Sequence, residues 1–313
     1  MKEKIYDVAI IGGGPAGITA AVYAKRTGLD VVLIEKEKEF GGQVLLTYEV
    51  ANYTGFGKVS GPELAKKMHQ NLLDNDIYCV HDEVSDTVLD GDVKQINCHK
   101  TTLKAYTVII AVGTAVRRLE VTNERQFLNN GISYSSARDR DKYLNKTVAV
   151  VGGGNTALED ALFLSQKAKK VYIIHRRDRF RGDDILVAEV LKNKKITPVW
   201  ESKVVDLVGK TQLQSVTLKN VVSEKTKVLK IDGLFVCIGR GAETDFIDEK
   251  VVRNENGYLV ADDNMQTNLD GVFVAGDIRN TPLRQIVCAT SDGAIAATSA
   301  FRYLGAKRGT SYV

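Results

Sequence analysis

One segment near the start of the chain reads Tyr6-Asp7-Val8-Ala9-Ile10-Ile11-Gly12-Gly13-Gly14-Pro15-Ala16-Gly17. Its first half is a short, apolar and branched run, which predicts a buried parallel strand. Its second half is a G-x-G-x-x-G loop. Gly12 permits a tight turn, Gly14 lets backbone N–H groups approach a pyrophosphate, and Gly17 lets the next helix pack on the strand. A glycine motif alone is weak evidence for a dinucleotide-binding site, so the flanking residues must support it.

The residues that follow complete a dinucleotide-binding unit. We expect a helix over residues 18–27 and a second strand over residues 31–35, and that strand ends in Glu35. Glu35 lies 18 positions past Gly17, where an acid holds the hydroxyl groups of a ribose. This unit consists of a strand, a loop, a helix, a second strand and an acid in the expected register. It predicts that the first part of the chain binds a dinucleotide.

The same unit recurs later in the chain. Residues 147–151 precede the loop 152–157, which again begins with three glycines, and residues 171–175 read as the second strand. Gly12 and Glu35 are 23 positions apart, as are Gly152 and His175. We therefore expect an α/β fold of two Rossmann-like dinucleotide-binding domains.

The second unit replaces the acid with a basic cluster, His175-Arg176-Arg177, followed by Arg181. Guanidinium groups hold a 2′-phosphate bidentately, whereas a carboxylate would repel it. The cluster predicts that the second unit binds NADPH in preference to NADH. The alternative is a solvated basic strand end with no ligand.

The order of the strands indicates an insertion. A strand over residues 107–114 closes the first stretch, and residues 233–239 close the second unit. Residues 271–277 form a further strand that ends in an acid and needs a sheet to join, and we place it on the first sheet. We expect the second domain, residues 118–244, to be inserted into the first, residues 1–117 and 245–313, and we expect a final helix to begin at Arg284-Gln285-Ile286.

Composition excludes several classes of function. The net charge of +4 comes from 43 basic and 39 acidic residues, and no aromatic-interleaved basic stripe suggests nucleic-acid binding. The most apolar stretch, residues 8–24, is too broken by glycine for a membrane span. No basic leader precedes it, so we expect a reducing, cytoplasmic location.

No two cysteines have the spacing of a metal or redox pair, and we interpret them as small hydrophobic residues: Cys79, Cys98, Cys237 and Cys288.

The chain resembles the low-molecular-weight thioredoxin reductase family over nearly its whole length. The resemblance implies FAD in the first domain, NADPH in the second, a homodimer, and a large rotation of one domain against the other. The matching residues are Gly12 to Gly17, Gly41-Gly42-Gln43, Glu49-Val50-Ala51-Asn52, Gly61-Pro62-Glu63-Leu64, Gly152 to Ala157, His175-Arg176-Arg177 with Arg181, Gly276-Asp277 and Arg284-Gln285-Ile286.

The resemblance also implies the cofactor-binding residues. Glu35 would bind the adenosine ribose of FAD, Asp277 the ribityl chain, and residues 284–286 would cap the isoalloxazine ring. The full FAD set is Gly12, Gly14, Pro15, Ala16, Gly17, Glu35, Lys36, Gly42, Gln43, Asn52, Val84, Gly113, Asp277, Arg284, Gln285 and Ile286. The NADPH set is Gly152, Gly154, Asn155, Thr156, Ala157, Glu159, His175, Arg176, Arg177 and Arg181.

One tetrad departs from the family pattern. Residues 135–138 read Ser135-Ser136-Ala137-Arg138, where the family has a Cys-x-x-Cys redox pair. Asp139 matches the acid that serves the family as a proton donor. A serine hydroxyl cannot cycle to a disulfide, and an arginine cannot act as a thiolate. Thioredoxin reduction is therefore the one family property that we do not expect here.

Four functions remain open after this loss. We favour electron transfer between NADPH and an acceptor directly through the flavin, because hydride transfer between the two cofactors needs no thiol. The expected acceptor is a small acidic carrier such as ferredoxin or flavodoxin, attracted by Arg138, Arg140 and Lys142. The alternatives are disulfide reduction through another thiol, with Cys288 best placed, an NADPH oxidase, and a non-catalytic flavin redox sensor.

Overall fold

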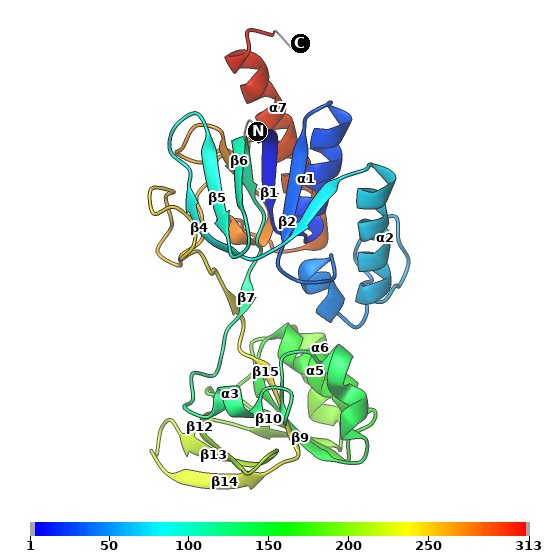
Figure 1. Cartoon of the computed structure of the whole chain (residues 1–313). Coiled ribbons are helices and arrows are strands. Elements are labelled where there is room, and N and C mark those ends of the chain that lie inside the picture. The colour runs from blue at the N-terminus through cyan, green and yellow to red at the C-terminus, as the bar shows by residue number, and fades with distance from the viewer. Residues whose placement is uncertain (1–3, 311–313) are drawn as a thin grey trace. The chain divides into compact units, whose positions relative to one another are not determined.

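The computed structural model describes residues 4–310 and divides into two compact units (Figure 1). Unit 1 takes in both ends of the chain, Met1–Ala115 and Gly241–Val313, and unit 2 is Val116–Arg240. The second unit is thus inserted into the first, which confirms the expected fold class. The borders lie two and four residues before the expected ones.

Unit 1 is built on a mainly parallel sheet. The strand order is β3-β2-β1-β6-β5-β4, and β17 joins the sheet beside β6. Strand β1 runs parallel to both β2 and β6, whereas β5 runs antiparallel to β6. The strands are β1 (Ile5–Ile11), β2 (Val31–Glu35), β3 (Tyr78–His81), β4 (Val84–Val88), β5 (Lys94–Cys98), β6 (Thr102–Ile110) and β17 (Val272–Val274). The return of the chain to the first sheet through β17 is as predicted.

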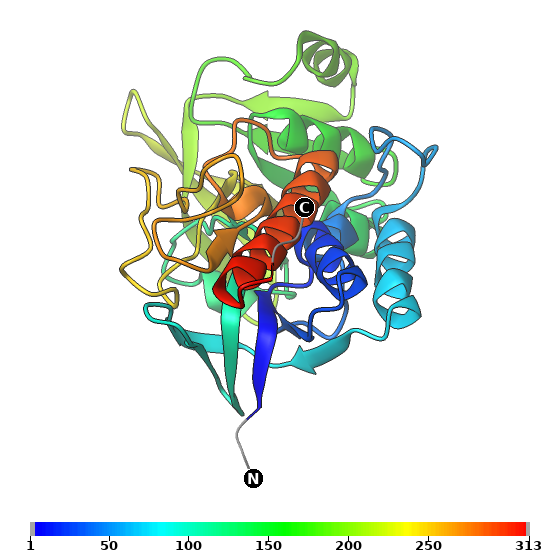
Figure 2. The ribbon, with the colours of Figure 1, turned by 90° about the horizontal axis from the view of Figure 1, so that it is seen from above.

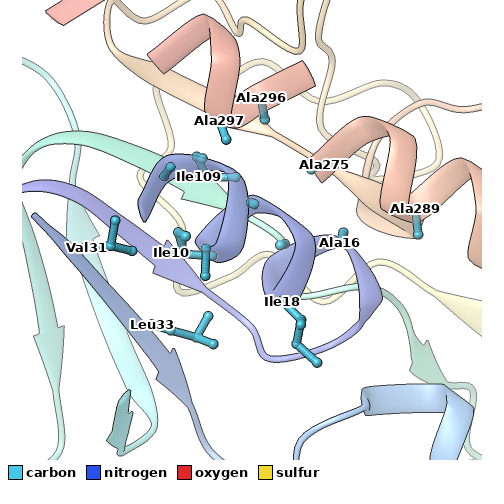
Figure 3. Close-up of a cluster of buried hydrophobic side chains, with 14 of the residues drawn as sticks. Ile10, Ala16, Ile18, Val31, Leu33, Ile109, Ala275, Ala289, Ala296 and Ala297 are labelled. Atoms are coloured by element: carbon cyan, nitrogen blue, oxygen red, sulfur yellow. The ribbon is translucent and has the colours of Figure 1, made fainter. Parts of the chain in front are cut away.

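Two helices of unit 1 pack closely on one another. In Figures 1 and 2, α7 (Ile286–Lys307) lies beside α1 (Pro15–Arg26). A Cβ on Gly293 would lie 2.2 Å from the carbonyl oxygen of Ala16, so this crossing requires glycine. Figure 3 shows alanines of α7 facing α1 over the core residues Ile10 and Ile109. The remaining elements are α2 (Gly61–Asp74), η1 (Gly42–Leu46) and η3 (Gly276–Ile278).

Helix α1 begins three residues earlier than expected, at Pro15. Proline is favoured in the first turn of a helix because its missing N–H would have no partner there. Helix α7 begins at Ile286 with Gln285 as its N-cap, so Arg284 and Gln285 precede the helix.

Unit 2 repeats the parallel arrangement on a smaller sheet. Its order is β11-β10-β9-β15-β8, and a separate antiparallel sheet has the order β12-β13-β14. The strands are β8 (Ile132–Ser133), β9 (Thr147–Gly152), β10 (Lys170–Ile174), β11 (Ile196–Val199), β12 (Ser202–Gly209), β13 (Leu213–Asn220), β14 (Thr226–Lys230) and β15 (Gly233–Cys237). The helices are α3 (Glu124–Phe127), α4 (Ser136–Asp139), η2 (Arg140–Tyr143), α5 (Asn155–Ser165) and α6 (Asp184–Lys192).

The two segments that connect the units pair with each other. Strand β7 (Ala115–Val116) and strand β16 (Arg240–Gly241) form a two-stranded sheet, and the backbone N–H of Arg117 donates to the carbonyl of Gly239 at 3.0 Å. Within residues 4–310, no helix combines the length and the apolar character needed to cross a bilayer.

Candidate functional site

The first glycine loop excludes side chains for steric reasons. Gly12 has φ +107°, and a Cβ there would lie 2.4 Å from the carbonyl oxygen of Ala111. A Cβ on Gly17 would lie 1.8 Å from the carbonyl oxygen of Gly12. Both contacts are far inside van der Waals distance, so the turn and the helix packing depend on glycine at these two positions.

The start of α1 suits a bound pyrophosphate. Gly14 is the N-cap, and in the described chain no side chain caps the helix and no acid lies in its first turn. A Cβ on Gly14 would meet nothing nearer than the Cα of Gly42, at 4.0 Å. Unpaired N–H groups at a helix N-terminus attract anions, so the residues present fit the FAD that the resemblance implies.

Glu35 lies against this loop at the end of β2. Its Oε2 accepts a hydrogen bond from the N–H of Gly13 at 2.6 Å, and its Oε1 accepts one from the N–H of Glu37 at 2.8 Å. The carboxylate is therefore held at the loop where a ribose is expected. Two other predicted FAD residues contact the protein itself. Lys36 forms an ion pair with Glu83 at 3.7 Å, and Val84 is a buried residue of β4.

Three segments converge beside the loop. Gln43 donates from Nε2 to the carbonyl and the hydroxyl of Thr114, at 3.1 and 2.9 Å. A Cβ on Gly113 would lie 3.5 Å from the same Nε2, and a Cβ on Gly42 would lie 3.2 Å from the Cα of Gly14. The structure thus brings together predicted residues that lie far apart in the sequence.

The residues before α7 are also joined to one another. Asn52 donates from Nδ2 to Oε1 of Gln285 at 3.1 Å, and Arg284 donates from Nε to the carbonyl of Asp277 at 3.3 Å. The Arg284 guanidinium lies 4.1 Å from the ring centroid of Tyr258. Among the described residues, α7 has no side-chain cap and no acid in its first turn, so the positive end of its dipole is left for a ligand.

Sequence reasoning missed Asp292, a buried acid within α7. Its Oδ2 accepts from the N–H of Gly276 at 3.1 Å and pairs with Nε of Arg279 at 3.0 Å. This pair fixes the turn that carries Asp277. The available signal was the single carboxylate of this helix, which requires a partner when buried.

The second glycine loop is built like the first. A Cβ on Gly152 would lie 2.3 Å from the carbonyl oxygen of Cys237, whereas a Cβ on Gly154 would meet nothing within 4 Å. Gly154 is the N-cap of α5, and within residues 4–310 the helix has no side-chain cap and no acid in its first turn. The loop therefore offers a second site for an anion.

The arginine segment is tied to this second loop. The N–H of Arg181 donates to the carbonyl of Gly153 at 2.7 Å, and Asn155 exchanges two 2.8 Å hydrogen bonds with Asp183. The side chains of Arg176, Arg177 and Arg181 are exposed. Three guanidinium groups on a segment fixed to the loop fit the 2′-phosphate of NADPH.

His175 differs from the three arginines. It is only 5% exposed, and a Cβ on Gly153 would lie 2.3 Å from its Cε1, so the ring packs under the loop. Burial, followed by the charges of Arg181, Arg177 and Arg176, lowers the pKa of His175. The structure therefore places it as a neutral packing residue, and the expectation that it binds the nucleotide directly is not supported by its position.

The tetrad lies at the start of α4, and its central feature is a buried acid. Asp139 is 2% exposed, and it accepts hydrogen bonds from Ser133 at 2.6 Å, Lys142 at 2.8 Å and Arg138 at 2.9 Å. Burial alone would raise the pKa of Asp139, but the hydrogen bonds from Arg138, Lys142 and Ser133 outweigh it and lower that pKa to about 2. The residues around Asp139 thus stabilise its ionised form.

The other residues of the tetrad hold the same segment in place. Ser135 and Ser136 are buried, and Ser136 donates from Oγ to Oδ1 of Asp160 at 2.5 Å. The thiol of Cys237 lies 3.1 Å from Oδ2 of the same carboxylate. Burial, and next Asp160, raise the pKa of Cys237 well above its ordinary value. The thiol of unit 2 is therefore a poor nucleophile.

All four cysteines are free and partly buried, so they are less buried than expected. Burial raises the pKa of Cys79 and that of Cys98 to about 11. Cys288 lies in the first turn of α7 and lines a pocket of about 390 Å³ with Leu283 and Val287. Within residues 4–310, no group of three or more acidic, histidine or cysteine side chains could hold a metal ion.

Comparison with known proteins identifies the family. The family model for pyridine nucleotide-disulphide oxidoreductases matches residues 6–293. The thioredoxin reductase of Peptoclostridium acidaminophilum is 40% identical over 311 residues, which cover 97% of this chain and 98% of that protein. The thioredoxin reductase of Lactococcus lactis superposes with a TM-score of 0.89 at 35% identity over 96% of this chain and 99% of that one. A ferredoxin-flavin thioredoxin reductase from Clostridium acetobutylicum superposes with a TM-score of 0.56 at 27% identity over 98% of this chain and 100% of that one.

The chain belongs to the pyridine nucleotide-disulphide oxidoreductase family. It is an NAD(P)H-dependent flavoprotein oxidoreductase of the low-molecular-weight thioredoxin reductase type, with FAD and NADPH as cofactors.

Proposed function

We propose that this protein exchanges electrons between NADPH and a small acidic electron carrier, such as a ferredoxin or a flavodoxin, directly through its flavin. The observation that carries the proposal is the ion pair of Arg138 with the buried Asp139. At the two tetrad positions expected to hold cysteines the chain has Ser135 and Arg138, so no dithiol stands between the flavin and an acceptor.

The ion pair also bears on proton transfer at the tetrad. A dithiol that reduces a disulfide needs a proton source near its leaving sulfur. The hydrogen bonds from Arg138, Lys142 and Ser133 lower the pKa of Asp139 to about 2 and so oppose its protonation. The tetrad therefore lacks the thiols of the disulfide reaction, and its acid takes part in a buried ionic contact that holds α4 in place.

The cofactor sites retain what hydride transfer requires from the protein. Bound FAD and NADPH supply the hydride chemistry between them. We propose that the N–H groups at the starts of α1 and α5 bind the two pyrophosphates and that Glu35 orients the ribose of FAD. Arg176, Arg177 and Arg181 would hold the 2′-phosphate of NADPH. The uncapped start of α7 would stabilise negative charge on a flavin ring placed before it.

Two further observations support a protein carrier as the partner. One structural relative is named a ferredoxin-flavin thioredoxin reductase, which links ferredoxin to a flavin on this scaffold. Arg138 and Lys142 are both more than half exposed at the tetrad, and such carriers are generally acidic, so their approach would be favoured. From the family resemblance we also propose that the protein is a homodimer.

Carrier reduction tests the proposal directly. FAD-loaded protein is mixed with NADPH and a panel of ferredoxin, flavodoxin, rubredoxin and a small dye, and thioredoxin with a disulfide substrate is assayed in parallel. We expect reduction of at least one carrier and no thioredoxin turnover. Thioredoxin turnover, or reduction of the dye but of no carrier, would contradict the proposal.

A further inference from the structure

The weak net charge of the chain conceals a strong division between the two units. Unit 2 contains 24 basic and 14 acidic residues, a formal charge of +10, whereas unit 1 contains 19 basic and 25 acidic residues, a formal charge of −6. The two values sum to the +4 of the whole chain. Segment 176–181 contains four arginines, and three of them, Arg176, Arg177 and Arg181, belong to the predicted NADPH site. This segment explains only part of the excess.

Most of the remaining excess lies at the opposite end of the sheet. Segments 140–147, 166–170 and 192–196, here called the lysine edge, carry nine basic residues and one acidic residue, Asp141. Two further acids face the edge: Asp232 through hydrogen bonds with the backbone of Thr147, and Asp139 through Lys142 at 2.8 Å. The lysine edge therefore keeps a large positive excess after its acids are counted.

The backbone joins these three segments into one surface. The N–H of Asn145 donates to the carbonyl of Lys167 at 3.0 Å, and the N–H of Lys169 donates to the carbonyl of Lys146 at 2.8 Å. The N–H of Val171 donates to the carbonyl of Lys195 at 2.9 Å. Strands β9, β10 and β11 begin at this edge in parallel register, so the basic residues lie side by side on a fixed support.

The lysine edge is separate from the nucleotide site. The glycine loop follows the carboxyl end of β9 and the arginine segment follows the carboxyl end of β10, whereas the lysine edge precedes both strands. Strands of this length place the two ends about 15 Å apart. That is more than the Debye length of about 8 Å at physiological salt, so NADPH binding does not account for the lysine edge.

The chemistry of the edge fits a transient protein partner. Lysines are mobile point charges that attract an acidic surface without fixing its orientation, and each exposed ion pair adds little affinity. Leu144, 58% exposed, lies between Lys142 and Lys146 in the sequence. An exposed leucine within a basic rim is typical of a protein interface and has no function toward a polyanion.

We propose that the lysine edge is the docking surface for the acidic electron carrier, with Leu144 as its apolar contact. This inference rests on the proposed function. Association is then steered by charge at low salt, and the complex dissociates readily, as electron exchange between soluble carriers requires. Several lysines are available for this contact. Lys169 and Lys194, for example, make no side-chain hydrogen bond or ion pair with any residue in the described range 4–310.

The test compares two charge-reversal variants with equal changes in net charge. The first is K146E/K169E/K194E on the lysine edge. The matched control is K203E/K225E/K227E on the separate sheet of strands β12 and β14 and the turn before β14. Binding of ferredoxin and of flavodoxin to the FAD-loaded proteins is measured by titration, and NADPH-driven carrier and dye reduction are measured over a range of salt concentrations. L144S is measured as a single variant.

We expect the lysine-edge variant to weaken carrier binding and raise the carrier KM by about tenfold or more at low salt. That difference should shrink at high salt, and the dye reduction rate should not change. L144S should weaken binding equally at low and high salt. The control variant should have a much smaller effect.

The other outcomes are decisive. Equal losses in both triple variants, or an unchanged carrier KM in the lysine-edge variant, overturn the inference while leaving the proposed function intact. A carrier that binds at the lysine edge but is never reduced contradicts the proposed function and leaves the docking surface standing. If neither carrier binds, the docking surface is wrong.

Discussion

Nη2 of Arg138 lies 2.9 Å from Oδ2 of Asp139, and the Asp139 side chain is almost completely buried while that of Arg138 is more than half exposed. The residue at the position expected for the second cysteine is thus the ionic partner of the acid that follows the tetrad. One residue thus stands where the second thiol was expected and also stabilises the ionised form of Asp139.

Acid stability should report this ion pair. The pKa of Asp139 is lowered from 3.8 to about 2 in the folded protein, so its contribution is fully present above pH 4 and is lost as pH falls through the folded pKa. The shift corresponds to about 2 kcal/mol of folding stability at neutral pH. Urea unfolding of wild type and D139N between pH 6 and pH 2 should show a stability difference that narrows toward pH 2. A constant difference would show that Asp139 is not ionised in the folded state.

The open space at Gly154 makes it a sensitive probe of the NADPH site. A Cβ there meets no protein atom within 4 Å, so G154A should fold with unchanged stability, yet its methyl group should intrude on the pyrophosphate. We expect the NADPH KM to rise about tenfold with little change in Tm. G57A, where a Cβ is equally free, serves as the control. Unchanged NADPH kinetics in G154A would place the nucleotide elsewhere.

The exposed arginines should determine the choice of nucleotide. R177Q removes one guanidinium from the proposed 2′-phosphate site, which should raise the NADPH KM by about tenfold and leave the NADH KM nearly unchanged. R125Q, which removes an exposed guanidinium from α3 in the same unit, serves as the control. Equal effects on both nucleotides would assign Arg177 a structural function.

The tetrad can be supplied with thiols again. S135C/R138C restores the Cys-x-x-Cys spacing at the start of α4, and the pair, once oxidised, can accept two further electrons. Anaerobic titration should then consume about two equivalents of NADPH per flavin. The single variant S135C should behave as wild type. A double variant that still consumes one equivalent would mean that a thiol pair at 135 and 138 does not communicate with the flavin.

The sequence predicted most of the fold and much of the candidate site because their signals are local. Gly12, Gly17 and Glu35 are short-range features of a single strand-loop-helix-strand unit, and the equal spacing in the second unit revealed the repeat. Contacts between distant segments could not be predicted. Asp292 acquires its function only when α7 packs beside the turn at Gly276, and His175 is buried because Gly153 lies above its ring.

The tetrad also combines a feature that the sequence shows with one that depends on contacts between side chains. Substitution of the cysteines is visible in the sequence, but whether Asp139 carries a proton depends on the three side chains that surround it. Likewise, the net charge of +4 gave no sign of the contrast between +10 and −6, which appears only when the charges of the two units are counted separately.

The stoichiometry of flavin reduction tests the central claim most directly. FAD-loaded protein is titrated anaerobically with NADPH while the flavin absorbance band is followed. Direct transfer through the flavin predicts complete bleaching at about one equivalent per flavin, because no thiol pair stores further electrons. Consumption of about two equivalents would show that a second two-electron centre, such as a pair involving Cys288, lies in the path and would contradict the proposal.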